Sequence, residues 1–341
     1  MKSASCVAAI ALASCGSGAV QPVHANLPLA PSFRAAGPMP ARQARSRVQS
    51  SWMSPDAKSI KSLLYVSGAG TGTVYVYDFK THQLVGELSG FDQPDGECVD
   101  GIGDIWITDY MGGTVSEYAH GGSTALKTLR AGTFQTACSI DPTTGNLAVG
   151  SFSPGEIYVW KKARGTPKLF SSTACPSLWG PGYDDKGNLF VEAATSGSAV
   201  FICWLPHRGN SLTVIPFNQT IGYGADVMWD GKYITFADQS FGGSELQAGV
   251  YQAELNSSGS LVLAGKTALP DPCGHSDVLQ PFIAGRKNTP DNKKQGYAAT
   301  GSNNSCLTNV DIWPYPAGGD PSYVIKAPEK VTFGTAVSIK E

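Results

Sequence analysis

The chain has 341 residues and a nearly balanced charge, with 25 Lys and Arg against 27 Asp and Glu. Charged residues make up only 15% of it, and no basic stripe runs along the sequence. This excludes the electrostatic footprint of a nucleic-acid-binding protein, so we expect no nucleic-acid partner. The 40 glycines and 22 prolines, with few segments of helical period, favour many short strands joined by tight turns.

The N-terminus is typical of an exported chain. Lys2 precedes a short apolar stretch over residues 6–12, well below the roughly 20 residues needed to span a bilayer. Residues 12–16, Leu-Ala-Ser-Cys-Gly, resemble the lipobox of bacterial lipoproteins, in which small residues precede a cysteine that becomes acylated. The resemblance implies a signal peptide over residues 1–15, a lipid on Cys15, and an anchored location at the cell envelope, in the periplasm or at the cell surface. The alternative is ordinary cleavage near Ala25, with Cys15 discarded.

Two regions follow the signal. Residues 16–58 are rich in Ala, Pro, Ser, Gln and Arg and have no sustained period of 2 or 3.6. They cannot bury enough apolar surface to order themselves, so we predict a disordered tether. Residues 59–341 are then a single folded domain, because all-β folds of this length are often one unit.

A short apolar strand recurs along this domain. The first four copies are 41, 42 and 42 residues apart, and a period of 40 to 45 residues is typical of propeller blades. A strand of alternating apolar residues follows each of these copies after a small-residue turn, which predicts hairpin partners. The copies begin at Leu64, Ile105, Leu147 and Leu189, with two further ones at Ile234 and Tyr297.

We therefore predict an all-β fold, a six-bladed β-propeller with four-stranded antiparallel blades. Each blade would contain an inner strand, a turn of Asp, Gly and Asn, the recurring apolar strand, the alternating strand and a polar outer strand. The copy at Leu64 has no inner strand before it, whereas residues 331–339 have the form of an inner strand with nothing after them. We expect the C-terminal strand to complete and close the first blade.

Residues 93–109 resemble the propeller superfamily of NHL repeats, senescence-marker/gluconolactonase proteins and streptogramin lyases, which share a Pro-x-Gly turn and a Leu-Trp-Val type strand. In the gluconolactonase-like branch the aspartate of a Pro-Asp-Gly turn is a metal ligand. The resemblance implies Asp95 as a ligand of a divalent cation, Ca²⁺ or Mg²⁺. That branch completes its site with Glu and Asn at other strand starts, and neither stands there in this chain. The lyase branch uses a histidine base beside a metal-binding acid, for which His275 and Glu97 are the candidates.

One face of the propeller is the predicted binding face. Loops that enter inner strands and loops that join the second and third strands meet there around the axis, and such a mouth is a favoured ligand position. Its acidic and aromatic side chains suit a polar ligand, a sugar or a cation. The first set of loops carries Asp95, Glu97, Gln135, Trp179, Tyr223, Asp226, His275 and Asp277, and the second carries Asp109, Tyr110, Asp238, Gln239 and Asn303.

Each of these residues also has a purely structural interpretation. Asp95 and Asp109 would cap their own turns, and Trp179 would cover the end of the core. His275 and Asp277 stand apart, because with Asp226 they place two acids and an imidazole at adjacent blade openings, where carboxylates raise the pKa of a histidine. We name His275 and Asp277 as candidate acid/base residues.

Six cysteines follow Cys15, an even number that favours disulfides in an exported chain. Cys273 lies just before the sixth inner strand and Cys306 near the third strand of that blade, so we favour a bridge between them. Cys175 and Cys203 in the fourth blade are the next choice. The last two, Cys98 and Cys138, occupy equivalent positions of successive inner strands and would point the same way round the ring, which leaves buried free thiols as an alternative to a bridge.

Two functions remain open. The first is a lipid-anchored, monomeric binding or interaction module at the cell envelope, with a protein, glycan or small polar ligand at the loop face. The second is a metal-assisted lactonase, hydrolase or lyase-like enzyme that uses Asp95 as ligand and His275 or Asp277 as acid/base. No Gly-x-Ser-x-Gly elbow, phosphate loop or dinucleotide fingerprint occurs in a strand-to-helix context, so serine hydrolases, kinases and dehydrogenases have no support.

Overall fold

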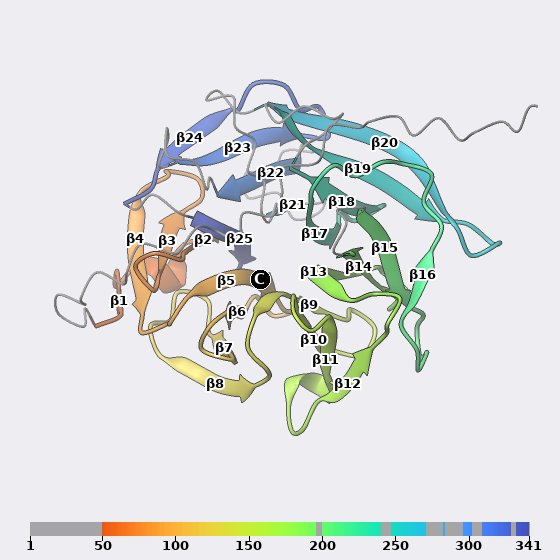
Figure 1. The fold of residues 1–341 in the computed structure, drawn as a ribbon. Helices are drawn as coiled ribbons and strands as arrows, with labels where there is room; N and C mark the ends of the chain where they lie inside the picture. The colour runs from red at the N-terminus through yellow and green to blue at the C-terminus, as the bar shows by residue number, and fades with distance from the viewer. Residues whose placement is uncertain are drawn as a thin grey trace, which may run out of the picture. The chain divides into compact units, whose positions relative to one another are not determined.

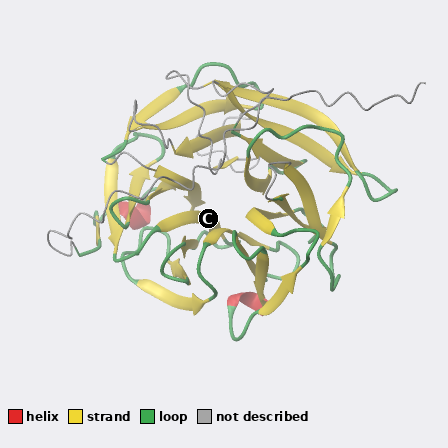
Figure 2. Cartoon of the chain, in the orientation of Figure 1, coloured by secondary structure: helices red, strands yellow, loops and turns green. Residues whose placement is uncertain are grey.

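Six antiparallel sheets surround a common axis in the computed structural model (Figure 1). The structure describes residues 50–195, 200–239, 247–270, 282–283, 296–301, 309–328 and 332–340, all within the unit of residues 39–341. Strands dominate this part of the chain, and the two helical segments are single 3₁₀ turns, η1 (Ala57–Ser59) and η2 (Lys161–Ala163) (Figure 2). No helix among the described residues is long and apolar enough to cross a membrane. Cys15 and residues 16–49 lie outside the described residues, so the lipid anchor and most of the tether stay predictions.

Four sheets follow the predicted repeat directly, and each runs from an inner strand near the axis to an outer strand at the rim. The second sheet contains β5 (Pro94–Val99), β6 (Ile105–Asp109), β7 (Thr114–Tyr118) and β8 (Ala125–Arg130). The third contains β9 (Gln135–Ile140), β10 (Leu147–Ser151), β11 (Glu156–Trp160) and β12 (Lys168–Ser171). The fourth contains β13 (Ser177–Tyr183), β14 (Leu189–Ala194), β15 (Val200–Leu205) and β16 (Thr213–Ile215). The fifth contains β17 (Gly224–Trp229), β18 (Ile234–Asp238), β19 (Gln247–Leu255) and β20 (Leu261–Pro270).

The sixth and first sheets depart from the prediction in detail. In the sixth sheet the first strand among the described residues is Phe282–Ile283, while His275, expected near the start of the sixth inner strand, lies outside the described residues. The first has five strands instead of four, because Trp52–Met53, inside the expected tether, pairs with Glu87 and Gly86. The sixth sheet contains β21 (Phe282–Ile283), β22 (Gly296–Gly301), β23 (Asn309–Tyr315) and β24 (Tyr323–Lys326). The first contains β25 (Thr332–Ile339), β2 (Ser62–Gly68), β3 (Thr73–Asp78), β4 (Leu84–Ser89) and β1 (Trp52–Met53).

The C-terminal strand takes the inner position of the first sheet, as predicted. β25 runs antiparallel to β2, with Ser62 opposite Ile339 and Gly68 opposite Thr332. Lys340 N also donates to Lys61 O at 2.8 Å. The two ends of the folded chain are therefore held in one sheet, which removes an open edge.

The core consists of hydrophobic clusters between successive sheets. Trp106 of the second sheet packs with Leu147 and Trp160 of the third, and all three side chains are almost completely buried. Val310 of the sixth sheet packs in the same way against Leu64 of the first. One such cluster lies between each pair of neighbouring sheets. Both faces of every sheet are thus covered by a neighbour, which is the arrangement that defines a propeller.

Two disulfides lie within the described residues. Cys175 and Cys203 are bridged, with their Cα atoms 6.4 Å apart, as predicted. Cys98 and Cys138 are also bridged, with a Cα separation of 5.5 Å, which corrects the expectation against this pair. Cys273 and Cys306 lie outside the described residues.

The register explains the error. Cys138 lies opposite Val149, whereas the residue at the equivalent place in the second sheet is Glu97, opposite Ile107. Cys98 is therefore one position out of step with Cys138. Because side chains alternate along a strand, this single step turns the Cys98 side chain toward the third sheet, where Cys138 meets it.

Candidate functional site

Five aromatic rings follow the face of the propeller where the inner strands begin, here called the mouth face. The rings of Tyr110 and Phe134 are 5.3 Å apart between centroids. Those of Phe152 and Trp179 are 5.7 Å apart, and Trp179 is 6.0 Å from Tyr223. All five are half-buried. We call this set the aromatic arc.

Main-chain hydrogen bonds between the loops hold the arc. Phe134 N donates to Tyr110 O at 2.6 Å, Phe152 N donates to Phe134 O at 2.8 Å, and Leu178 N donates to Phe152 O at 3.3 Å. Phe134 has a φ of 62°, a conformation that is costly for a bulky residue and is kept only where neighbouring contacts enforce it. The loops of three successive sheets are therefore tied into one rim.

Asp109 and Asp238, both predicted to bind ligand, organise the loops that carry the arc. The Asp109 carboxylate accepts hydrogen bonds from the main-chain N–H groups of Asp92 and Gln93 at 2.8 Å and of Gly112 at 3.1 Å. Asp238 accepts from Gly222 N and Tyr223 N, both at 3.0 Å. These bonds place Tyr110 and Tyr223 on the rim, which agrees with the structural interpretation of Asp109.

Four carboxyl groups lie just inside the arc, near the axis. Asp95 and Glu97 belong to β5, Asp226 to β17 and Glu192 to β14. Their exposed fractions are 9%, 7%, 7% and 0%. The register shifts between Pro94 and Glu97 and again at the start of β17, and such bulges redirect side chains at strand ends. We call these four residues the axial acids.

Two of the axial acids, Glu97 and Glu192, are linked to a neighbouring sheet through one repeated position. It is the fourth residue of the recurring apolar strand, and in three of the sheets it bonds to the inner strand of the next sheet. The links are Ser67 Oγ donating to Glu97 Oε1 at 2.6 Å, Thr108 Oγ1 donating to Thr136 O at 2.7 Å, and Ala225 N donating to Glu192 Oε2 at 2.8 Å.

Burial dominates the electrostatics of this cluster. It raises the pKa values of Glu97, Glu192 and Asp226 well above their ordinary range, because ionised carboxylates lose their hydration there. The charges of Asp95 and Asp226 raise the pKa of Glu97 further, while the Ser67 hydrogen bond opposes the shift. Among the described residues, no ion pair reaches Glu97, Glu192 or Asp226. The centre of the mouth face thus contains buried carboxyl groups that favour their protonated form.

Two glycines create the space in which the arc meets the axial acids. A Cβ atom at Gly224 would lie 2.7 Å from Trp179 Cε3 and 2.8 Å from Glu192 Oε2. One at Gly180 would collide with the Asp226 carboxylate. The Trp179 ring and the Asp226 carboxylate therefore both depend on close approach to bare backbone.

We expect Gly224→Ala to displace Trp179 and to lower the free energy of unfolding by about 1–3 kcal/mol, since the extra methyl group has no room. Chemical denaturation measures the stability, and Trp179→Phe in the same background identifies the part of the fluorescence change that belongs to this ring. Gly101→Ala is the matched control, because nothing lies within 4 Å of a Cβ there. Equal stability of the two variants would contradict this geometry.

A metal site based on Asp95 is not completed by the described residues. Among the described residues, the ligand oxygens of Asp100, Asp104 and Glu117 do lie within 4.8 Å of one another. These three acids are at the opposite end of β5 from Asp95. Asp100 Oδ1 there already accepts from Asp104 N at 2.9 Å, and Glu117 pairs with Lys127 at 2.9 Å. The turn and the sheet account for that cluster, and we derive no metal chemistry from either place.

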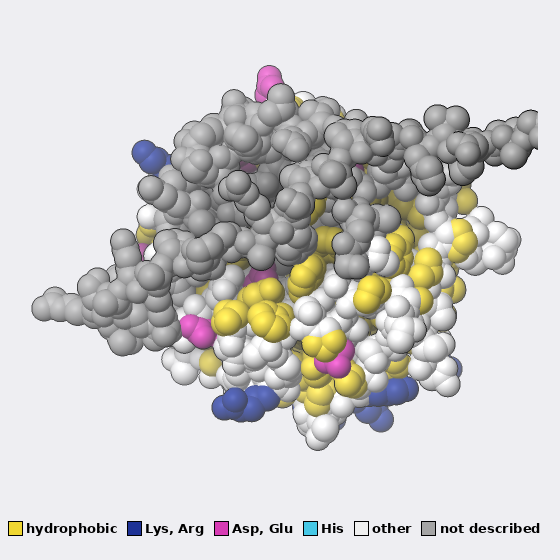
Figure 3. Space-filling model, in the orientation of Figure 1, with side chains coloured by type: hydrophobic (Ala, Val, Ile, Leu, Met, Phe, Trp, Pro, Cys, Tyr) yellow, Lys and Arg dark blue, Asp and Glu magenta, His cyan; other side chains and the backbone are white. Residues whose placement is uncertain are grey.

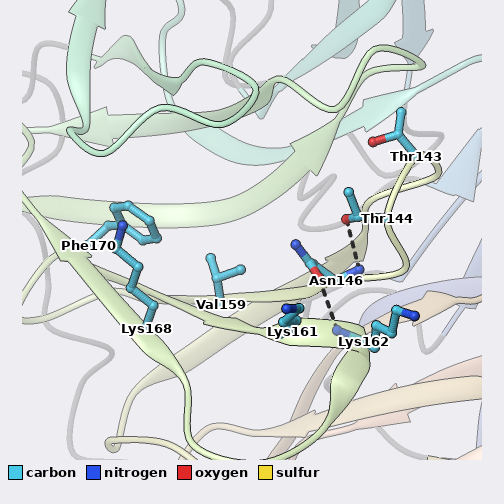
Figure 4. A pocket seen from close by; sticks show the side chains of 8 residues that line it. All are labelled: Thr143, Thr144, Asn146, Val159, Lys161, Lys162, Lys168 and Phe170. Atoms are coloured by element: carbon cyan, nitrogen blue, oxygen red, sulfur yellow. Dashed lines mark hydrogen bonds between the residues drawn. The ribbon is translucent and has the colours of Figure 1, made fainter.

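A hollow lies on the third sheet, beside η2 and β12 (Figure 4). Its volume is about 620 Å³. Asn146 Oδ1 accepts from Lys162 N at 3.0 Å and Thr144 Oγ1 accepts from Asn146 N at 3.3 Å, so these polar groups already serve the fold. None of the predicted site residues borders it. Its lining consists of Thr143, Thr144, Asn146, Val159, Lys161, Lys162, Lys168 and Phe170.

The structure thus brings together most of the described residues predicted for the site. Asp95, Glu97 and Asp226 lie near the axis, Tyr110 and Trp179 form part of the arc, and Gln135 lies fully buried at the start of β9. His275, Asp277 and Asn303 lie outside the described residues. In the view of Figure 3, hydrophobic side chains gather near the centre of the face with acidic ones among them, while Lys and Arg lie at the edge.

The prediction missed Glu192, Phe134 and Phe152. Glu192 was detectable as a lone charge in the apolar run Leu-Phe-Val-Glu-Ala, where an unpaired ionised group is costly. Phe152 follows β10 as Tyr110 follows β6, and Phe134 precedes β9 as Tyr223 precedes β17, so a closer alignment of the repeats would have found them.

Comparisons with known proteins show the fold alone. No family model matches the sequence, and no curated protein matches it. A chain from a nidogen/laminin complex matches with a TM-score of 0.59 and 12% identity, covering 82% of this chain and 99% of that one. A protein of unknown function from Bacteroides caccae matches with a TM-score of 0.56 and 13% identity, over 82% and 100%. A streptogramin B lyase matches with a TM-score of 0.45 and 12% identity over 69% of each chain, too distant to carry an argument. With the sheets described above, these likenesses define the chain as a β-propeller.

Proposed function

We propose that this protein is an exported, lipid-anchored β-propeller that acts as a binding module at the cell envelope, with its ligand held at the mouth face. The observation that carries the proposal is the aromatic arc around the axial acids. Half-exposed rings beside buried carboxyls are typical of a ligand site, because convergent polar groups within an apolar rim give both affinity and orientation. The fold alone, shared with proteins of mixed description, favours neither binding nor catalysis.

The blade count and the anchor belong to this proposal. Six sheets with one hydrophobic cluster between each neighbouring pair support six blades, of which the first is closed by β25. The lipobox-like residues 12–16 support acylation of Cys15, with residues 16–49 as the tether. The proposal also includes a disulfide between Cys273 and Cys306 and a monomeric state.

The enzyme alternative rests on the raised pKa values of Glu97 and Asp226, since a protonated carboxyl at neutral pH is a candidate general acid. His275 and Asp277 remain its candidate acid/base residues, and Asp95 its candidate metal ligand. Binding is the better-supported function, because aromatic rings lie beside the axial acids, as Trp179 lies beside Glu192.

Binding is tested by thermal denaturation of the purified protein against a panel of sugars, peptides, organic ammonium compounds and divalent metal salts. We expect at least one ligand to raise the melting temperature of the parent but not of Trp179→Ala or Tyr110→Ala. Leu169→Ala, in an exposed position on the outer strand β12, is the control and should behave as the parent. The proposal fails if every ligand that acts on the parent acts equally on the mouth variants.

The anchor is tested separately by growing the host with an alkyne-labelled fatty acid. The full chain should incorporate the label and fractionate with membranes, and Cys15→Ser should do neither. Equal labelling of the two chains would remove the lipid anchor from the proposal and leave the mouth face untouched.

A further inference from the structure

The hollow on the third sheet gathers positive charge around an apolar floor. Val159 is half-buried and Phe170 is 7% exposed, and both pack against the hydrophobic cluster between the third and fourth sheets. Figure 4 shows Lys168 and Phe170 at one end, Lys161 and Lys162 at the other, and Val159 between them. Lys168 Nζ lies 4.5 Å from the centroid of the Phe170 ring. The volume of about 620 Å³ is within the range of roughly 300–1,000 Å³ that is typical of small-molecule sites.

The three lysines of the hollow have no acidic counterpart. Among the described residues, no ion pair involves Lys161, Lys162 or Lys168, and no Asp or Glu is among those that line the hollow. Glu156 is three residues before Val159 on β11, so its side chain points to the opposite face of the strand. Positive charges that share one recess concentrate anions from solution, and a bound anion would offset their mutual repulsion.

The backbone beneath two of these lysines is held in an unusual conformation. Lys162 and Ala163 both have a φ of 49°, in the left-handed region that residues with a Cβ atom seldom adopt. Lys162 N donates to Asn146 Oδ1 at 3.0 Å, and Ala163 is buried in the same hydrophobic cluster as Trp160. These contacts fix the turn that carries Lys161 and Lys162. Strained turns that are held in place by their surroundings are frequent at binding sites.

The uncharged polar groups of the hollow leave one donor for a ligand. The hydroxyls of Thr143 and Thr144 both donate to the Asp141 carboxylate, which is 3% exposed and is thereby occupied within its own turn. Asn146 Nδ2, in contrast, makes no hydrogen bond with any residue that the structure describes. The groups that remain for a ligand are therefore three ammonium groups and one amide, all of them hydrogen-bond donors.

We propose that this hollow binds a small organic anion, in which an apolar ring or chain carries a carboxylate, sulfonate or phosphate group. The apolar body lies on Val159 and Phe170, and the acidic group lies against the ammonium groups of Lys161 and Lys162. No residue of the aromatic arc and none of the axial acids lines the hollow. The inference therefore goes beyond the proposed function and adds a second binding site.

Isothermal titration of the purified full chain with naphthalene-2-sulfonate tests the inference. Two matched probes divide the interaction: naphthalene-2-sulfonamide keeps the ring and lacks the charge, whereas inorganic sulfate keeps the charge and lacks the ring. We expect the sulfonate to bind at least tenfold more tightly than either, because only the sulfonate uses both the lysines and the apolar floor.

Variants locate the binding site on the third sheet. The double variant Lys161→Gln and Lys162→Gln should weaken sulfonate binding about tenfold, since it removes the charges but keeps side chains of similar length. Lys326→Gln, at an exposed position on the outer strand β24, is the control and should bind as the parent does. Trp179→Ala should also leave the affinity unchanged. Melting temperatures measured without ligand verify that every variant is folded.

Five results would overturn the inference. Equal binding of the sulfonamide would show that the lysines play no part, and equal binding of inorganic sulfate would show the same for the apolar floor. Unchanged affinity in the double lysine variant would place the sulfonate elsewhere on the protein, and loss of binding in Trp179→Ala would place it at the mouth face. The absence of measurable sulfonate binding at millimolar concentration would refute the site itself, while the mouth-face proposal would still be decided by the thermal panel.

Discussion

The Glu97→Gln variant is expected to gain stability relative to the parent as the pH rises from about 4.5, the ordinary pKa of a glutamate. Burial, with the charges of Asp95 and Asp226, raises the pKa of Glu97 in the folded chain well above that of the unfolded chain. Between the two pKa values the folded state binds more protons, so the parent loses stability with rising pH. Glutamine does not titrate and escapes this loss.

The expected slope is roughly 1.4 kcal/mol per pH unit in favour of the variant, until the folded pKa of Glu97 is passed. Burying the glutamine amide of the variant changes its free energy of unfolding by the same amount at every pH. Such a change shifts the plot of this free energy against pH without changing its slope. Urea denaturation from pH 4 to 8 measures the difference. Glu254→Gln, at an exposed position on β19, is the control. Parallel curves for Glu97→Gln and the parent would show that Glu97 is not held in an acidic, buried environment.

Removal of the Cys98–Cys138 bridge is expected to have the largest effect on stability. The bridge joins residues 40 apart in sequence and ties the inner strand of the second sheet to that of the third. Closing a loop of this length restricts the unfolded chain, and the chain-entropy model gives a loss of about 4 kcal/mol for the double replacement with alanine.

The measurement is chemical denaturation of the double alanine variant under oxidising conditions. The corresponding variant of Cys175 and Cys203, which lie 28 residues apart, is the comparison and should lose a similar amount. An unchanged unfolding midpoint after removal of Cys98 and Cys138 would contradict the bridge, and mass spectrometry of the parent without reduction provides an independent check.

The sequence was most informative where local rules repeat. The apolar strands at Leu64, Ile105, Leu147 and Leu189 and their turns follow from alternation and turn chemistry, so the propeller and the position of the C-terminal strand were predictable. Register was not, because it depends on the length of the turn after each inner strand, which has five residues between Val99 and Ile105 but six between Ile140 and Leu147. That single residue made Cys98 look equivalent to Cys138 and concealed their bridge.

The candidate site was predictable in its location and less so in its composition. Loops that enter inner strands must share one face, so Asp95, Trp179 and Asp226 could be placed near the axis from the repeat alone. Glu192 comes from the second strand of its sheet and reaches the site across the boundary with the next sheet, through its bond to Ala225. Contacts of this kind follow from the rotation between neighbouring sheets, which no single repeat contains.

A crystal structure of the protein with a ligand that raises its melting temperature in the thermal panel tests the central claim most directly. We expect that ligand on the mouth face, in contact with the rings of Tyr110 and Trp179. The ligand bound elsewhere, with the aromatic arc empty at saturating concentration, would contradict the claim.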